Sequence, residues 1–140
     1  MTRVLALDLG SRRVGVAASD PGRVLATPLT TIARSASVAE DHRRIAVLVG
    51  ECQAEQVIVG LPLSLDGRDG PAARAARAEV EALREVLAVP VDVVDERFTT
   101  VTAHERLRQA GRNGRARTGL VDQSAAAVLL QAWLDGSSNV

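Results

Sequence analysis

The sequence contains no lysine, so all 17 basic residues among its 140 are arginines. Arginine binds phosphate through two parallel hydrogen bonds and keeps its charge at physiological pH, which suits a phosphate-binding protein. A genome rich in G and C, which favours arginine over lysine, is the alternative explanation. Because 17 acidic residues bring the net charge to zero, any nucleic-acid surface must be a local patch rather than the whole molecule.

Aromatic residues and cysteine are also scarce. One Phe, one Trp and no Tyr argue against base stacking as the main source of nucleic-acid affinity. The single Cys52 excludes an internal disulfide and a cysteine-based zinc cluster, and we expect it on the buried face of a helix. No apolar run approaches the ~20 residues that a membrane span needs. Met1 leads into a predicted strand without a signal-peptide pattern, so we expect a cytoplasmic protein with no membrane partner.

Alternating apolar runs and turns predict an α/β fold in a single domain, residues 1–140. Strands joined by tight turns are antiparallel, whereas strands reached through helices are expected to be parallel to their predecessor. The simplest arrangement is a mixed five-stranded sheet in the order 3-2-1-4-5 with helices on its faces. Pro28 cannot donate to a sheet ladder, which places the third strand at an edge. The expected strands are 4–9, 14–18, 24–30, 57–60 and 91–94. Four helices are expected: one from the Ser37 cap to Cys52, one from Pro71 to Leu87, one that ends at Gly111, and one over 121–134.

Hydrophobic spacing predicts which helix faces are buried. Ser37 and Glu40 form a predicted capping box, in which each side chain satisfies the other residue's free amide. We expect His42 and His104 on the surface, because both lie among arginines. The predicted buried positions are Val38, Ile45, Leu48, Val49 and Cys52 in the first helix and Ala76, Val80, Leu83 and Leu87 in the second.

Asp8 interrupts a strand that should be buried on both faces. A carboxylate there is costly unless it is paired or bound to a metal. Sheets of this kind bind ligands at the carboxyl ends of strands where the strand order reverses, and Asp8 lies toward that end of the first strand. The alternative is a structural role in which Asp8 caps the turn at Gly10.

Three further acids compete for a place beside Asp8. Asp95 and Glu96 close the fifth strand, whose end should emerge on the same rim, although capping of the next helix is an alternative for Asp95 in particular. Asp122 stands at the start of the final predicted helix, where an N-cap role is the alternative. Converging carboxylates without a His or Cys ligand set predict a site for Mg²⁺ or Mn²⁺. Such ions on acids are the usual apparatus for phosphodiester hydrolysis.

Glycines and arginines supply candidate phosphate contacts. The loop from Val59 to Gly70 either brings backbone amides to a phosphate or merely turns the chain into a helix. The segment 106–120 contains five arginines and no acid; a solvated helix face is the alternative to the phosphate-backbone contact that we favour. The candidate nucleic-acid contacts from turns and loops are Arg12, Arg13, Arg112, Arg115 and Arg117.

Four segments together resemble the YqgF/RuvX family of pre-16S rRNA nucleases and Holliday junction resolvase-like proteins. They are Leu5–Ser11 with Val14–Ala17, Val59–Leu63 with Asp66-Gly67, Asp95–Thr100, and Val121-Asp122 with Ser124–Ala126. The resemblance covers nearly the whole chain in the same order.

The resemblance implies an RNase H-like fold, divalent-metal catalysis and a bacterial cytoplasmic role in maturing the 5′ end of 16S rRNA. It places Asp8, Glu96 and Asp122 at the family's acidic positions, as catalytic residues and metal ligands, and leaves open whether Asp95 replaces or assists Glu96. Arg97 and Thr99 match its polar positions and would contact phosphate or support the acids. Where relatives often carry lysine before Asp122, this chain has Arg115 and Arg117, which preserves the charge.

Four functions remain open at this point. The first is a nuclease acting on structured RNA, with ribosomal precursor particles as partners, and the second is an endonuclease for branched DNA. Two symmetric cuts in a DNA junction need a two-fold dimer, whereas we expect a monomer or weak homodimer. The third is an actin-like ATPase, which needs a second domain to close over the nucleotide. The fourth is a non-catalytic nucleic-acid-binding module.

Overall fold

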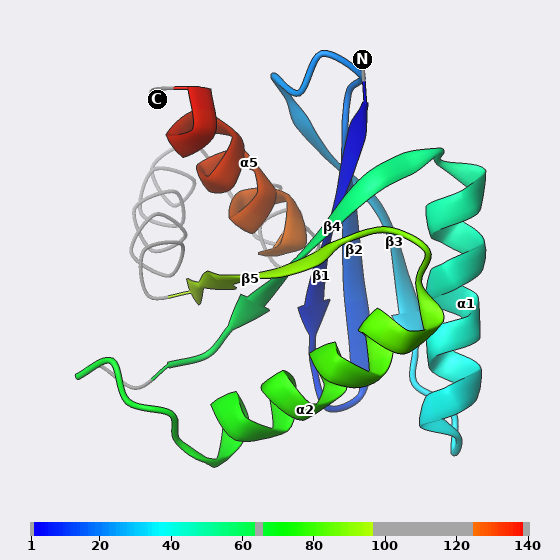
Figure 1. The fold of residues 1–140 in the computed structure, drawn as a ribbon, viewed down its shortest axis with the longest axis vertical. Coiled ribbons are helices and arrows are strands. Elements are labelled where there is room, and N and C mark those ends of the chain that lie inside the picture. The colour runs from blue at the N-terminus through cyan, green and yellow to red at the C-terminus, as the bar shows by residue number, and fades with distance from the viewer. Residues whose placement is uncertain (1, 64–65, 97–124, 139–140) are drawn as a thin grey trace, which may run out of the picture.

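The computed structural model describes residues 2–63, 66–96 and 125–138. These residues form one mixed sheet and three helices (Figure 1). The strands are β1 (Arg3–Leu9), β2 (Arg13–Ser19), β3 (Ala26–Ala33), β4 (Ala54–Leu61) and β5 (Val91–Asp95), and the helices are α1 (Val38–Glu51), α2 (Pro71–Val86) and α5 (Ala125–Ser138).

The strand order is β3-β2-β1-β4-β5, which confirms the predicted topology. The first three strands are antiparallel, and β1, β4 and β5 are parallel. Pro28 lies in the edge strand β3, as predicted. That strand begins two residues later than predicted, because the Asp20 carboxylate accepts hydrogen bonds of 2.8 Å from the amides of both Val24 and Leu25 and holds them in the preceding turn.

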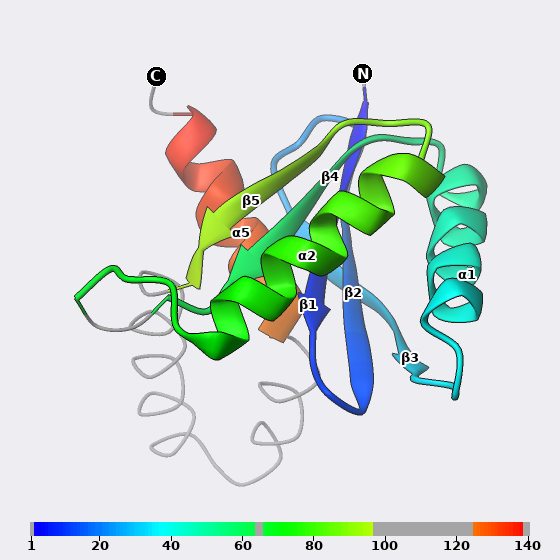
Figure 2. The same cartoon turned by 60° about the horizontal axis from the view of Figure 1, so that its bottom comes forward.

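Alternate residues of each strand point to opposite faces of the sheet. Leu5 and Leu7 of β1 face α1 and α2, where they pack with Ile45, Val80 and Leu83. On the other face, the intervening strand residues pack against α5. Figure 2 shows α2 in front of the strands and α5 behind them. The α5-side core comprises Val4, Ala6, Ala17, Ile58, Ala126, Ala127, Leu129, Leu130 and Leu134.

The helix boundaries follow from capping. The Ser37 hydroxyl accepts a hydrogen bond of 3.2 Å from the Glu40 amide, which confirms half of the predicted capping box. The other half is wrong, because the Glu40 carboxylate binds Arg43 instead. Val38 was expected to be buried but is 54% exposed. The buried residues of α1 begin at Asp41.

Most other predicted core positions are confirmed. Ala76, Val80, Leu83 and Leu87 are buried, and Cys52 is half-buried at the end of α1, against the core. The predicted helix ending at Gly111, the loop 112–119 and the predicted helix start at Val121 lie outside the described residues. In the described part of the chain, no helix is long and apolar enough to cross a membrane.

Candidate active site

Asp8 lies near the carboxyl end of β1 on the face of the sheet that α5 covers. Its partner in β2 is Gly15, and its neighbour Leu7 pairs with Val59 of β4, so Asp8 lies beside Gly60. Glycine on both sides leaves the Asp8 carboxylate without flanking side chains from β2 and β4. Burial raises the pKa of Asp8 above its usual range, because removal from water disfavours the charged form. The position that the sequence argument assigned to Asp8 is therefore correct.

Glu96 follows the end of β5 and lies against the bare backbone of Gly60. A Cβ atom on Gly60 would stand 2.7 Å from Glu96 Cγ and 2.9 Å from its Cδ, closer than real Cβ atoms come. The space that a side chain at this position of β4 would fill is thus filled by the Glu96 carboxylate. Gly60 lies between Asp8 on β1 and Glu96, the residue that follows β5.

The charge of Asp8 affects the ionisation of Glu96. Burial raises the pKa of Glu96, and the negative charges of Asp8 and Asp95 raise it further. The protein disfavours the charged forms of both acids, and a bound cation would stabilise those charged forms. The structure thus brings Glu96 together with Asp8, as predicted.

Asp95 differs from Glu96 in its position. It closes β5 opposite Leu61, and Leu61 packs with Ala73 and Ala76 of α2. Since Val94 packs on the α5 side, strand alternation directs residue 95 toward the α2 side of the sheet. Asp95 contributes negative charge to the site through its effect on Glu96. The three atoms nearest to a Cβ built on Gly60 all belong to Glu96.

The turn after Asp8 carries two exposed arginines, Arg12 and Arg13. The Gly10 amide donates to the Asp8 carbonyl at 3.1 Å and to the Arg13 carbonyl at 2.9 Å. A Cβ on Gly10 would lie only 2.6 Å from that Arg13 oxygen, which explains why this tight turn has glycine there. The two predicted nucleic-acid contacts thus lie at the end of a tight turn that begins two residues after Asp8.

The remaining predicted site residues lie outside the described residues. Among the residues that the structure describes, no group of three or more His, Cys, Asp or Glu side chains is arranged to hold a metal ion. The third predicted ligand therefore stays a prediction, and so does the spacing of the three acids. The undescribed candidates are Asp122, Arg97, Thr99, Arg112, Arg115 and Arg117.

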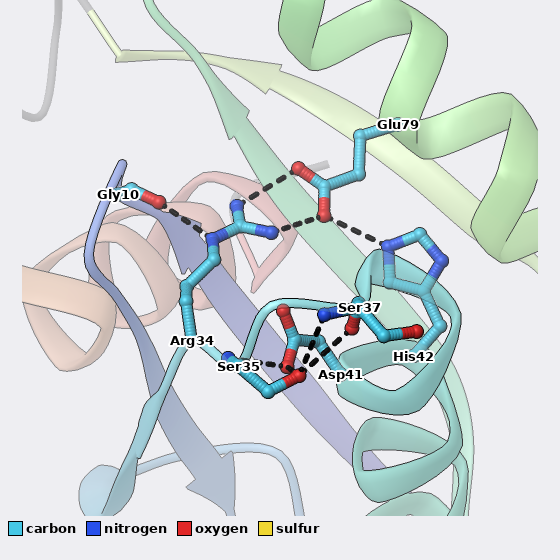
Figure 3. Close-up of polar contacts among 7 residues, drawn as sticks. All are labelled: Gly10, Arg34, Ser35, Ser37, Asp41, His42 and Glu79. Atoms are coloured by element: carbon cyan, nitrogen blue, oxygen red, sulfur yellow. Dashed lines mark hydrogen bonds and ion pairs between the residues drawn. The ribbon is translucent and has the colours of Figure 1, made fainter.

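A buried polar network beside the site was missed by the sequence argument (Figure 3). His42 was expected on the surface, but it is 2% exposed, and its Nε2 lies 2.8 Å from Glu79 Oε2. Glu79 also binds the guanidinium of Arg34 through both oxygens. One signal was available: His42 precedes the buried Ile45 by three residues and Val49 by seven, a spacing that places all three on one helix face.

Comparison with known proteins identifies the family of this chain. A family model described as RuvX, Holliday junction resolvase, matches residues 2–136. The chain belongs to the RuvX family. Relatives that carry the name "Putative pre-16S rRNA nuclease" include proteins of Thermobifida fusca, 53% identical over 139 residues, and Frankia casuarinae, 51% identical over 132 residues. Each match covers 94% of this chain; the chain spans 86% of the Thermobifida protein and 65% of the Frankia protein.

Solved structures confirm the fold expected of a RuvX protein. Thermus thermophilus RuvC in complex with a Holliday junction substrate matches 96% of this chain and 96% of its own, with a TM-score of 0.59 and 18% identity. A second structure, described as Thermus thermophilus RuvC, matches 96% of this chain and 97% of its own, with a TM-score of 0.57 and 16% identity. The RNase H-like fold predicted from the sequence is therefore confirmed.

Proposed function

We propose that this RuvX protein is a divalent-metal-dependent nuclease that hydrolyses phosphodiester bonds in the 5′-end maturation of pre-16S rRNA, in the bacterial cytoplasm. The observation that carries the proposal is the placement of Asp8 and Glu96 on either side of Gly60, on one face of the sheet, with the pKa of each raised. Membership of the RuvX family supports a hydrolase, and the names of the relatives support RNA as the substrate.

The chemistry of the donor atoms fits Mg²⁺ or Mn²⁺. Both ions prefer carboxylate oxygens. A cation between Asp8 and Glu96 would offset the burial that raises the pKa of both acids and the negative charge of Asp8 that raises the pKa of Glu96 further. Asp122 is the proposed third ligand. A metal held there would activate water and stabilise the leaving oxygen of a phosphodiester.

The protein's own residues divide the remaining work. Asp8 and Glu96 must lose their protons to bind a cation. Arg12 and Arg13 are proposed to hold the phosphate backbone beside Asp8, through charge-assisted hydrogen bonds that fix the position of the strand without selecting a base sequence. Asp95 is proposed to assist by adding negative charge near Glu96.

Cleavage of a pre-16S rRNA precursor with Mg²⁺ or Mn²⁺ tests the proposal. Wild type should cut the precursor, whereas Asp8→Asn and Glu96→Gln should lose about 100-fold or more in kcat. Asp92→Asn is the matched control, because Asp92 is an exposed acid of the same strand that binds Gln56. Equal cleavage by the two site variants and wild type would show that the carboxylates are not catalytic.

The same variants distinguish the other functions. A branched DNA substrate in a parallel reaction tests the junction-resolving alternative, which also requires a dimer in solution. A non-catalytic binding module would retain its function in Asp8→Asn. Preference for the DNA junction over the RNA precursor would overturn the choice of substrate but leave the nuclease assignment in place.

A further inference from the structure

Arg34 connects three parts of the fold at a single point beside the candidate active site. Its backbone amide donates to the Arg12 carbonyl at 2.9 Å, and its Nε donates to the Gly10 carbonyl at 2.9 Å. Both acceptors belong to the turn that joins Asp8 to Arg12 and Arg13. Arg34 follows the end of β3. The turn between β1 and β2 is therefore held by hydrogen bonds from a residue outside the β1–β2 hairpin.

The other side of the guanidinium is held by Glu79 of α2. The two outer nitrogens of Arg34 donate to the Glu79 oxygens at 2.7 and 2.9 Å, a paired geometry that fixes the plane of the guanidinium. Nε2 of His42 in α1 donates to Glu79 Oε2 at 2.8 Å, because a carboxylate oxygen can only accept. The Arg34 and Glu79 side chains are only 16% and 15% exposed, so water screens this pair less than a surface ion pair.

A third contact fixes the backbone next to Arg34. The Ser35 amide and hydroxyl both donate to Asp41 Oδ1, at 2.9 and 2.8 Å (Figure 3). Asp41 is fully buried in the first turns of α1. The hydrogen bonds from Ser35 and the charges of nearby arginines lower the pKa of Asp41 by more than burial raises it, so this pKa lies below its usual range.

We propose that Arg34 is a positioning residue for the active site: through its contacts with Gly10 and Arg12, it holds the turn that presents Asp8 and the phosphate-binding arginines. This inference rests on the proposed nuclease function and names how the site's geometry is maintained. Small displacements of reacting groups can cost about 100-fold in rate. The guanidinium is suited to this task because it contacts the carboxylate and the carbonyl with different nitrogens, whereas a lysine ammonium has one.

Arg34→Lys is therefore the informative variant, since it keeps the charge opposite Glu79 and loses the fork. Arg84→Lys is the matched control. Arg84 also donates its Nε to a carbonyl, that of Val91 at 2.9 Å, and its outer nitrogen to a carboxylate, that of Glu81 at 2.6 Å, but at the start of β5. We expect Arg34→Lys to reduce kcat about tenfold or more, and Arg84→Lys to leave kcat within about twofold of wild type. Equal losses in the two variants would overturn the proposal.

RNA affinity gives a readout that does not depend on catalysis. A fluorescein-labelled RNA duplex is titrated without divalent cations, in wild type and in an Arg12→Ala/Arg13→Ala background. Arg34→Lys should weaken binding about threefold to tenfold in wild type but not in the double-alanine background, because residues that act through one another are not additive. Equal weakening in both backgrounds would show that Arg34 does not act through the turn.

The affinity measurement also separates the two proposals. If wild type cleaves neither RNA nor DNA, the nuclease function fails, while the dependence of RNA binding on Arg34 still decides the positioning role. Should Arg34→Lys fail to fold, Glu79→Gln replaces it, because it leaves Arg34 in place and removes the paired carboxylate. The same direction of change in kcat and RNA affinity is then expected, and unchanged values would overturn the proposal.

Discussion

The carboxylate of Glu96 lies in the space that a side chain on Gly60 would otherwise occupy. This relationship joins two strands at the site: Gly60 of β4 makes room, and the residue after β5 fills it. The lack of a Cβ at one position is therefore part of the arrangement of the acids, although glycine itself carries no chemical group.

Gly60→Ala should displace Glu96 and leave the rest of the fold intact. The new methyl group would overlap Glu96 Cγ and Cδ, and a shifted carboxylate should lower kcat about 10- to 100-fold. Gly50→Ala is the control, because no atom beyond its chain neighbours and the backbone of its own helix lies within 4 Å of a Cβ built on Gly50. Circular dichroism checks the fold, and wild-type cleavage by a folded Gly60→Ala variant would contradict the assigned role of Glu96.

Removing either site carboxylate should stabilise the metal-free protein. The folded-state pKa values of Asp8 and Glu96 are raised, so above those values the charged forms oppose folding and the free energy of unfolding falls as the pH rises. Asp8→Asn and Glu96→Gln should therefore raise the Tm at pH 7 by about 2–4 °C, and this difference should vanish at low pH.

Adding a divalent metal should make the wild type more stable than the two variants. Mg²⁺ or Mn²⁺ that binds the folded wild type stabilises it by mass action, whereas the two variants should gain little. Calorimetry with and without the cation measures both effects. An equal rise in Tm on adding metal to wild type and to Glu96→Gln would contradict the proposed ligand role.

Glu79→Gln should weaken the fold at neutral pH. Burial would raise the pKa of Glu79, but hydrogen bonds from Arg34 and His42 outweigh it, so the pKa is lowered. The stabilisation is present above the ordinary glutamate value and is lost as the pH falls through the lower folded-state value. Urea unfolding at pH 7 should show a loss of about 1.5–3 kcal/mol, which shrinks below about pH 4; a constant difference at all pH values would contradict this assignment.

Gln131 of α5 should be necessary for the packing of that helix beside β3. Its side-chain nitrogen donates to the Val24 carbonyl at 3.0 Å, and its oxygen accepts from the Ala26 amide at 2.9 Å. Gln131→Glu removes the donor and places a second negative charge near Asp135, and it should cost about 1–3 kcal/mol. The exposed Gln53→Glu serves as the control in the same unfolding experiment.

The sheet order was predictable because each part of it follows from a local rule. Tight turns at Gly10 and at residues 20–22 force antiparallel neighbours, and a helix between two strands favours a parallel pair. Asp8 was predictable for a related reason, since one acid in a continuous apolar strand is costly. Neither inference requires knowledge of distant contacts.

The rest of the site depends on contacts between residues far apart in the chain. The placement of Glu96 depends on its contact with Gly60, which lies more than thirty positions earlier. The Arg34–Glu79 pair joins residues 45 positions apart. In the sequence, each residue alone looks like an ordinary charged surface residue. His42 is different: we expected it on the surface, although its spacing to Ile45 and Val49 is a local signal of burial that requires no knowledge of its partner.

The amide of Gln131 makes the same two hydrogen bonds, one given and one received, that a further strand would make with the outer edge of β3. An exposed edge is a template for strands of other molecules. By satisfying Val24 and Ala26 from within the same chain, Gln131 closes the beginning of that edge to intermolecular pairing. A helix side chain thus occupies the first backbone groups that a strand of another molecule would use to extend this sheet.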